Sequence, residues 1–248
     1  SLSVRMETRD IDRVRYSIAW IKVKSPTQLR TYTAGKPNEV RLARPSRMAR
    51  SKNAVVAING DYYVERKDGL IFRQGVSYRY LLNEEKDSLV IDENGNFHTF
   101  LKSQGITVGK NATNSKENLQ DLIEAEGVEG KILHAFTFGP ALVKDGNHLE
   151  VDTGYGYNPN GREPRSAIGQ MGPLSYVMVI AEGRGESVGV THQELADFMF
   201  LLGCEEAYNL DGGGTAAMYY NGDYYNDLAG SERAVSDIIY FASAVTEE

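Results

Sequence analysis

The residues best suited to chemistry lie near the C-terminus, where an aspartate stands directly before three consecutive glycines. This segment follows an apolar stretch over residues 206–210 and consists of Asp211, Gly212, Gly213, Gly214 and Thr215. Three glycines in a row are unfavourable in backbone entropy unless the main chain must turn at positive φ or approach another group closely. A carboxylate before such a turn stands at the end of a predicted strand, where ligand-binding and catalytic residues commonly gather. We therefore expect a functional site at this turn.

A second candidate segment follows the apolar run over residues 54–58, which is typical of a strand buried on both faces. Asn59, Gly60 and Asp61 come directly after it, at the start of the pentapeptide Asn-Gly-Asp-Tyr-Tyr. The same pentapeptide recurs at residues 221–225, between aromatic residues, where it predicts a tight hairpin with an Asn-Gly turn. We interpret the second copy as structural and the first as part of a candidate site.

The elements that must position these residues are mostly strands. Strands are expected at residues 17–24, 131–138, 165–170, 175–181 and 237–245, with a short helix beginning at Pro45 and a polar-faced helix over 111–127. The clearest helix begins after Thr191, which forms a capping box with Glu194, and it ends at Gly203. Residues 152–164 show no periodicity and predict a long surface loop.

This pattern predicts an α/β fold of α+β character, with flanking helices around a mixed, mostly antiparallel β-sheet core. We expect one domain over residues 1–248. In it, residues 1–50 supply N-terminal strands and a short helix, and residues 51–245 carry the motifs.

The composition limits the classes of function. A chain of 248 residues with 41% hydrophobic and 25% charged residues is ordinary for a globular protein and can bury a core without a disulfide or metal staple. A net charge of −7 argues against nucleic acid as the main partner. The single cysteine, Cys204, excludes an intramolecular disulfide and is interpreted as a buried hydrophobe. The four histidines lack metal-ligand spacing, and no stretch approaches the roughly 20 apolar residues of a membrane span.

Five motifs, taken together and in this order, resemble the phosphodiester glycosidase family. They are Ala-Ile-Asn-Gly-Asp-Tyr-Tyr at 57–63, Phe-Gly-Pro-Ala-Leu-Val at 138–143, Pro-Arg-Ser-Ala-Ile-Gly at 164–169, Glu-Gly-Arg at 182–184 and Asn-Leu-Asp-Gly-Gly-Gly-Thr at 209–215. The resemblance covers residues 50–245 and implies a hydrolase of sugar-1-phosphodiesters, such as those of N-acetylglucosamine. Three positions depart from the family pattern: Asp61 replaces a glycine, Glu182 an aspartate and Thr215 a serine.

The family reading implies that positive charge matters more than a strong general acid. The leaving group is a phosphate monoester, whose second pKa is roughly 6, so it departs with little need of protonation. Arg165, Arg184 and Arg233 are the candidates to bind it, because a guanidinium binds two phosphate oxygens at once and keeps its proton. The alternative for each is an ordinary solvated or salt-bridged arginine. The glycine N–H groups would add an anion-binding nest, or would only permit close packing.

The same reading implies a carboxylate that stabilises or attacks an oxocarbenium-like transition state, or that activates water. Asp211 is the first candidate, although its carboxylate could instead hold the turn by accepting hydrogen bonds from the glycine N–H groups. Asp61 and Glu182 compete for the second carboxylate role. Gly60, Thr215 and Asn59 complete the expected substrate-binding set, with Asn59 either contacting sugar hydroxyls or shaping its own turn.

Two other functions fit the sequence. One is a non-catalytic module that binds anionic glycans, and the other is an ordinary glycosidase or a polysaccharide lyase. We expect a carbohydrate phosphodiester, including exopolysaccharide, as the partner, and no cofactor. A calcium ion held by Asp211 and neighbouring carbonyls is compatible with the sequence but not required. We expect an extracellular or cell-surface bacterial protein whose targeting segment has been removed.

Overall fold

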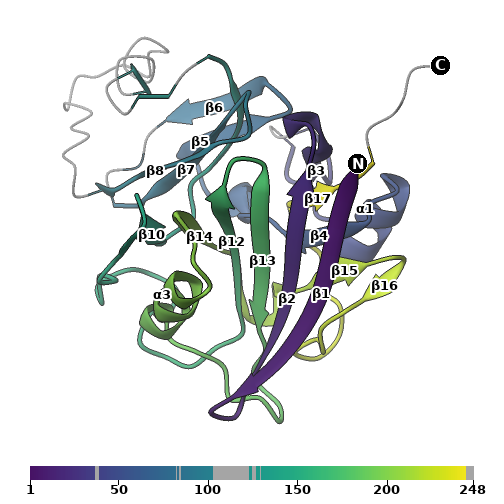
Figure 1. Ribbon diagram of the computed structural model, residues 1–248, viewed down its shortest axis with the longest axis vertical. Helices are drawn as coiled ribbons and strands as arrows, with labels where there is room; N and C mark the ends of the chain where they lie inside the picture. Colours follow the sequence, from purple (N-terminus) through teal and green to yellow (C-terminus); the bar gives the residue numbers. More distant parts are fainter. Residues whose placement is uncertain are drawn as a thin grey trace.

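Antiparallel sheets dominate the computed structural model, which describes residues 1–36, 39–81, 83, 85–102, 123–124, 127–128 and 130–243 (Figure 1). The large sheet has seven strands in the spatial order β1 (Leu2–Ile11), β2 (Val14–Val23), β13 (Ser175–Ala181), β12 (Arg165–Gly172), β14 (Glu206–Leu210), β10 (Ala141–Lys144) and β11 (Asn147–His148). Its first two strands form a ten-pair hairpin that projects beyond the rest of the sheet (Figure 1).

Two five-stranded sheets complete the β structure. The second sheet has the order β16 (Asp223–Tyr224), β15 (Met218–Tyr220), β4 (Val56–Asn59), β17 (Asp237–Phe241) and β3 (Leu29–Thr33). The third has the order β6 (Val76–Leu81), β5 (Gly69–Arg73), β9 (Ile132–Phe136), β7 (Ser88–Asp92) and β8 (Phe97–Phe100). Short 3-10 helices cover Pro26–Gln28, Tyr63–Glu65 and Gly213–Thr215.

The main hydrophobic core lies between the sheets. It combines Ile180 of the large sheet, Ile58 of the second sheet and Ile91 of the third in one cluster of buried side chains. The near-continuous apolar runs of β4 and β13 follow from this position, because a strand covered on both faces carries hydrophobic residues without alternation.

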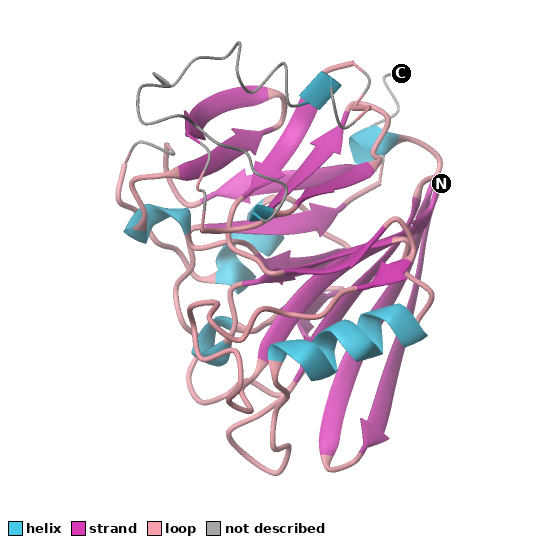
Figure 2. Cartoon of the chain, turned by 90° about the vertical axis from the view of Figure 1, so that its left-hand side faces the viewer, coloured by secondary structure: helices cyan, strands magenta, loops and turns pink. Residues whose placement is uncertain are grey.

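The two longer helices cover the outer faces. Helix α3 (His192–Leu201) packs Leu195 and Met199 on the outer face of the large sheet, and Figure 2 shows it lying across that sheet. Its capping box is present: the Thr191 hydroxyl accepts from the Glu194 N–H, and the Glu194 carboxylate accepts from the Thr191 N–H. Helix α1 (Pro45–Ser51) packs Met48 and Ala49 against the second sheet.

The predicted α+β fold with mostly antiparallel sheets and flanking helices is confirmed, and every strand ladder within the described ranges is antiparallel. The helix predicted over residues 111–127 falls almost entirely outside the described residues. In the described part of the chain, no helix has the length and apolar character needed to cross a membrane.

Strand ends bring the motifs together. In the large sheet Ser166 pairs with Leu210, so the beginning of β12 lies beside the end of β14. The end of β4 joins them from the second sheet, because the Asn59 Oδ1 accepts from the Ser166 hydroxyl at 2.8 Å and the Gly60 carbonyl accepts from the Asp211 N–H at 3.1 Å. Three motifs that are distant in the sequence therefore meet where the two sheets approach each other.

Candidate functional site

The Asp211 side chain is held in one position by its own turn. One carboxylate oxygen accepts from the Gly212 N–H at 2.9 Å, and the other accepts from the Thr215 hydroxyl at 2.7 Å. The main chain of Asp211 is tied to the end of β4, since its carbonyl accepts from the Asn59 Nδ2 at 2.5 Å. The turn-holding contacts expected from the sequence are thus present, and they also fix the direction of the carboxylate.

The pKa of the Asp211 carboxyl is raised toward neutral pH. Burial raises the pKa of its carboxyl to about 6, and the hydrogen bonds from Thr215 and Gly212 and the charges of Arg233 and Arg66 only partly offset this effect. A carboxyl with a pKa near the working pH can exchange a proton during a reaction. Strongly perturbed carboxyls in clefts are also typical of functional sites.

Asp211 borders a cavity of about 280 Å³. Its lining includes Phe138, Tyr157, Glu163, Arg184, Asp211 and Gly213. The cavity thus combines two aromatic rings with two carboxylates and, counting Arg165, two guanidinium groups. Such a combination suits a ligand that has both a sugar ring and an anionic group.

Two arginines lie directly against the glycine run. A Cβ on Gly213, which has φ of 62°, would stand 3.2 Å from the Arg184 Nη2. A Cβ on Gly214 would stand 2.7 Å from the Arg233 Cδ. The glycines therefore serve both purposes expected of them, a left-handed turn and the close approach of other groups.

Both of these guanidinium groups keep N–H donors available. The Arg184 Nε donates to Glu163 at 2.7 Å, and its side chain is 49% exposed. Arg233 is exposed and makes no hydrogen bond or ion pair with any described residue. Together they place positive charge on the solvent side of the Asp211 turn.

Arg165 also lines the Asp211 cavity, but its guanidinium is bound to groups of the protein. Its Nε–H donates to the Val190 carbonyl, and its four terminal N–H groups donate to three carbonyls of the 157–161 loop and to the His192 Nε2. A guanidinium has five N–H donors, so all of them are engaged. Burial lowers the Arg165 pKa to about 10, which still leaves the group charged at neutral pH. Arg165 holds the predicted long loop against the cavity.

Asp61 is fully buried in an ionic network beneath the site. Its carboxylate accepts from the Arg73 Nη2 at 3.1 Å and the Arg66 Nη2 at 3.2 Å, and Arg73 also pairs with Asp237 at 2.7 Å. A Cβ on Gly60 would stand 2.0 Å from the Asp237 Oδ1, so only glycine fits there. This network anchors the first copy of the pentapeptide.

Asn59 likewise acts within the protein. It is fully buried, its Nδ2 donates to the Asp211 carbonyl, and its Oδ1 accepts from Ser166 and from the Ala217 N–H at 3.2 Å. These bonds tie the ends of three strands together. These bonds reach beyond the turn that Asn59 was expected to shape, and its role toward a sugar stays a prediction.

Glu182 borders a second cavity, of about 300 Å³, and not the cavity beside Asp211. Its Oε1 accepts from the Ser17 hydroxyl at 3.2 Å and from the Asp227 N–H at 3.1 Å, and burial raises its pKa. Arg184 lines both cavities, so one arginine is common to the surroundings of Glu182 and of Asp211.

The comparison with known proteins agrees with this geometry. A family model described as phosphodiester glycosidase matches residues 52–242, which include every motif strand end described above. The chain belongs to the phosphodiester glycosidase family.

The similar proteins comprise one relative found by its sequence and several solved structures with the same fold. A prophage-derived uncharacterized protein of Bacillus subtilis, YomE, is 27% identical over 202 residues; the match covers 77% of the chain but only 28% of the length of that relative. The catalytic domain of zebrafish N-acetylglucosamine-1-phosphodiester alpha-N-acetylglucosaminidase, solved in a form auto-inhibited by its pro-peptide, has the same fold with a TM-score of 0.71. It shares 16% identity, over 98% of this chain and 83% of that one. A hypothetical protein from Synechocystis has a TM-score of 0.67 and 15% identity, over 96% and 61% of the two chains.

Sequence reasoning missed one arginine near this candidate site. The Arg66 side chain is 9% exposed, and its Nε and Nη1 are buried without a hydrogen-bond partner. Its guanidinium lies 5.6 Å from the centroid of Phe138, which stacks on Tyr157 at 4.7 Å, and both rings line the Asp211 cavity. Because buried N–H groups are rarely left unpaired, Arg66 is a further candidate to bind an anion. Its only sequence signal is its place seven residues after Asn59.

Proposed function

We propose that the protein hydrolyses the bond between a sugar anomeric carbon and the phosphate of a sugar-1-phosphodiester. Membership of the phosphodiester glycosidase family supports this reaction class. The observation that carries the proposal is the Asp211 carboxyl, whose pKa is raised to about 6 and which borders a cavity beside Arg184. The site thus offers a tunable carboxylate for the sugar and positive charge for the phosphate.

Arg184 and Arg233 bind the phosphate in this proposal. They lie against consecutive glycines of the Asp211 turn and retain free N–H donors. Arg66 adds positive charge from beneath, and this charge already acts on the Asp211 carboxyl, whose pKa it lowers. Their combined charge stabilises the departing phosphate as an anion, which removes the need for a strong general acid.

Asp211 acts at the anomeric carbon in its ionised form. In that form the carboxylate can stabilise or attack the oxocarbenium-like transition state. Glu182, whose Oε2 makes no hydrogen bond with a described residue, activates the water from the neighbouring cavity. Asp61 acts as a positioning residue, since both of its oxygens are held by buried arginines.

We also propose that the reaction proceeds without a metal ion. The turn carbonyls that would join Asp211 around calcium are already acceptors: Asp211 from Asn59, Gly212 from the Thr215 N–H and Gly213 from the Ala216 N–H. Among the described residues, no group of three or more acidic, histidine or cysteine side chains is arranged to hold a metal. Full activity in the presence of EDTA would support this part, and recovery by added calcium would contradict it.

A binding module without catalysis is the second candidate. Asp61 stands where a glycine is usual, and its two oxygens are both paired with arginines. A family member with this change could hold anionic glycans without cleaving them. In that case calorimetry would detect binding of a sugar-1-phosphodiester that is never consumed.

The deciding assay follows the release of free sugar from a panel of sugar-1-phosphodiesters, beginning with N-acetylglucosamine α-phosphodiesters. We expect turnover by the wild type and a loss of about 100-fold or more for Arg184→Gln, which removes a phosphate ligand. Lys67→Gln, which removes an exposed charge beside Arg66, is the matched control. Absence of turnover with every diester would contradict the proposal. We place the activity outside the cell, because one structural relative (TM-score 0.60) is a Burkholderia pseudomallei protein described as exported.

A further inference from the structure

A row of exposed arginines runs along helix α1. Arginines occur at every third position, and in the order of the chain they are Arg41, Arg44, Arg47 and Arg50. All four are exposed, while Met48 and Ala49 of the same helix are buried against the second sheet. With a helical rise of about 1.5 Å per residue, successive members of the row on α1 advance by about 4.5 Å. The row is therefore an extended basic strip and not a single site.

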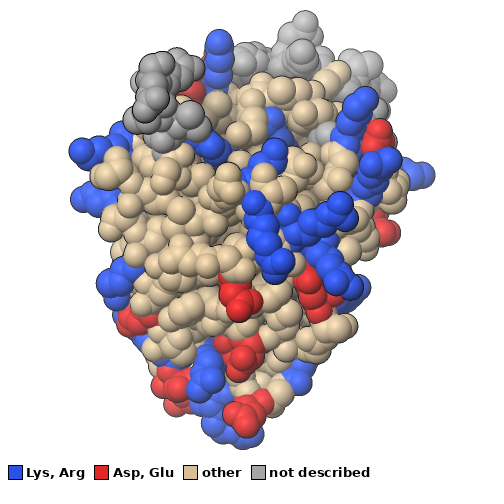
Figure 3. All heavy atoms as spheres, turned by 90° about the vertical axis from the view of Figure 1, so that its right-hand side faces the viewer, with Lys and Arg blue, Asp and Glu red and all other residues tan. Residues whose placement is uncertain are grey.

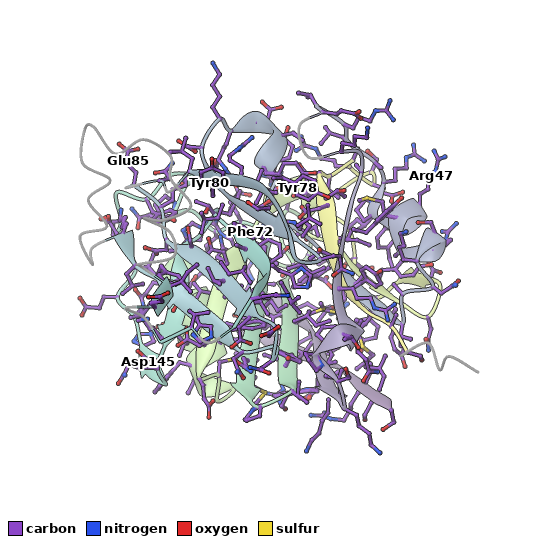
Figure 4. All side chains as sticks on the ribbon, turned by 90° about the horizontal axis from the view of Figure 1, so that it is seen from above. Arg47, Phe72, Tyr78, Tyr80, Glu85 and Asp145 are labelled. Carbon is purple, nitrogen blue, oxygen red and sulfur yellow. The ribbon has the colours of Figure 1, made fainter. Side chains whose placement is uncertain are left out.

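The strip contrasts with the rest of an acidic protein. Residues 40–52 contain five basic residues and no acidic one, although the whole chain has a net charge of −7. Figure 3 shows basic side chains gathered on the face where Figure 1 draws α1. Arg47 makes no contact with an acidic group among the described residues, and Figure 4 places it at the outer edge of the molecule. Its charge is therefore available to a partner.

One end of the strip joins the candidate active site. Glu232 accepts from the Ser46 N–H at 3.1 Å and from its hydroxyl at 2.7 Å, which fixes the beginning of α1. The next residue, Arg233, lies against Gly214 in the Asp211 turn. Arg44 lies 4.0 Å from Glu232, so Glu232 links the strip to Arg233 of the site, although its carboxylate offsets part of the Arg44 charge.

The other end of the strip borders a shallow groove of about 440 Å³. The groove is lined by Arg50, Asn53, Tyr219 and Asn221, whose amides and hydroxyl suit sugar hydroxyl groups. Arg50 donates from Nε to the Tyr219 hydroxyl at 3.3 Å, so charge and hydroxyl lie side by side. Tyr219 follows Gly214 by five residues, so the groove lies within about 18 Å of the glycine run.

We propose that the strip binds the continuation of a polymeric substrate, a glycan chain whose sugars are joined by phosphodiesters. The internal phosphates contact Arg44, Arg47 and Arg50, and a sugar occupies the groove while the bond to be cleaved lies at Asp211. This inference rests on the proposed function and names its substrate class. A polymer with one charge per unit matches an evenly spaced basic row, and amide and hydroxyl groups beside the charges match sugars better than lipid chains or bases.

The test compares two substrates and two variants. The substrates are a synthetic oligomer of at least four N-acetylglucosamine units joined by 1-phosphodiesters and the methyl phosphodiester of one unit. Arg47→Gln/Arg50→Gln should raise KM for the oligomer about fivefold, because exposed ion pairs contribute modestly, and leave kcat unchanged. KM for the single unit should stay within twofold. Lys22→Gln/Lys131→Gln, which removes one exposed charge from β2 and one from the residue before β9, should change neither value.

Added salt should raise the oligomer KM of the wild type more than that of the arginine variant, because screening acts on exposed charges. Equal oligomer KM values for the variant and the wild type would overturn the inference, as would an equal loss on the single unit. Tighter wild-type binding to phosphatidylglycerol vesicles or single-stranded DNA than to the oligomer would also overturn it. If neither substrate is turned over, the proposed function fails, and calorimetry with the oligomer still tests the strip by itself.

Discussion

The pentapeptide Asn-Gly-Asp-Tyr-Tyr occurs twice, and its two copies have different structures. In the first copy Asp61 is fully buried and ion-paired with Arg66 and Arg73. In the second, Asn221 and Gly222 form the left-handed turn of an exposed hairpin, with φ of 46° and 101°, and Asp223 is exposed. The same five residues therefore form a buried ion-paired segment next to the candidate site in one place and an exposed hairpin turn in the other.

The difference comes from what surrounds each copy. The first follows a strand buried between sheets, and β17 and β5 supply Asp237 and Arg73 to it. The second lies at the edge of the second sheet: it follows β15, and the edge strand β16 is itself part of this copy. Tertiary contacts thus determine the role of each copy. Substituting the same residue in both copies measures how much these contacts contribute to stability.

The largest contrast is expected for the aspartates. Asp61→Ala leaves Arg66 without its carboxylate partner and Arg73 with Asp237 alone, and it should lower the free energy of unfolding by about 3–5 kcal/mol. Asp223→Ala removes an exposed carboxylate and should change it by less than about 0.5 kcal/mol. Urea unfolding followed by circular dichroism measures both. Similar losses for the two variants would mean that the buried network is not what holds the first copy.

The glycines should differ less. Gly60→Ala places a methyl group 2.0 Å from the Asp237 Oδ1. The buried network must shift, at a cost of about 3 kcal/mol. Gly222→Ala meets no atom closer than 3.9 Å but holds an alanine at positive φ, at a cost of about 1–2 kcal/mol. Only Gly60→Ala should also reduce turnover, because the Gly60 carbonyl holds Asp211. A loss of turnover in Gly222→Ala alone would reverse the assignment of the two copies.

The asparagines give the smallest contrast. Asn59→Ala leaves the Ser166 hydroxyl and the Ala217 N–H unpaired and should cost about 2 kcal/mol. It should also reduce turnover, because Asn59 holds the Asp211 carbonyl. Asn221→Gly keeps a residue suited to the left-handed turn and should be neutral within about 0.5 kcal/mol. Thermal unfolding with a parallel activity assay checks the pair, and full activity in Asn59→Ala would remove Asn59 from the support of the site.

The parts of the fold that depend on local signals were predictable. The capping box of Thr191 and Glu194 marks the beginning of α3, and the Asn-Gly turn marks the hairpin of β15 and β16. Both signals act within a few residues, so the sequence alone contains them. The close approach expected at the glycine run is also present, but the sequence did not show that Arg184 and Arg233 are the groups that approach.

The parts of the site that depend on distant contacts were not predictable. Arg165 resembles a phosphate ligand in the sequence, yet it donates to main-chain carbonyls. Every residue has such a carbonyl, so the sequence does not indicate which ones Arg165 will contact. Asp61 resembles a catalytic residue in the sequence. In the structure its N–H donates to Asp237, which lies 176 residues away in the chain, and the sequence gives no sign of this contact. Arg66 gave no motif signal, because its importance lies in the N–H groups that the fold leaves unpaired.

The central claim is that the ionised Asp211 carboxylate acts at the anomeric carbon, and the pH dependence of kcat/KM tests it most directly. The folded-state pKa is raised to about 6, so Asp211 gains its proton as the pH falls through 6. We predict that kcat/KM for a sugar-1-phosphodiester is constant above about pH 7 and falls about tenfold per pH unit well below 6. Asp211→Asn should lose about 1,000-fold, or roughly 4 kcal/mol of transition-state stabilisation. A wild-type kcat/KM that stays constant between about pH 7 and 5, or an Asp211→Asn variant with more than about a tenth of wild-type activity, would contradict the claim.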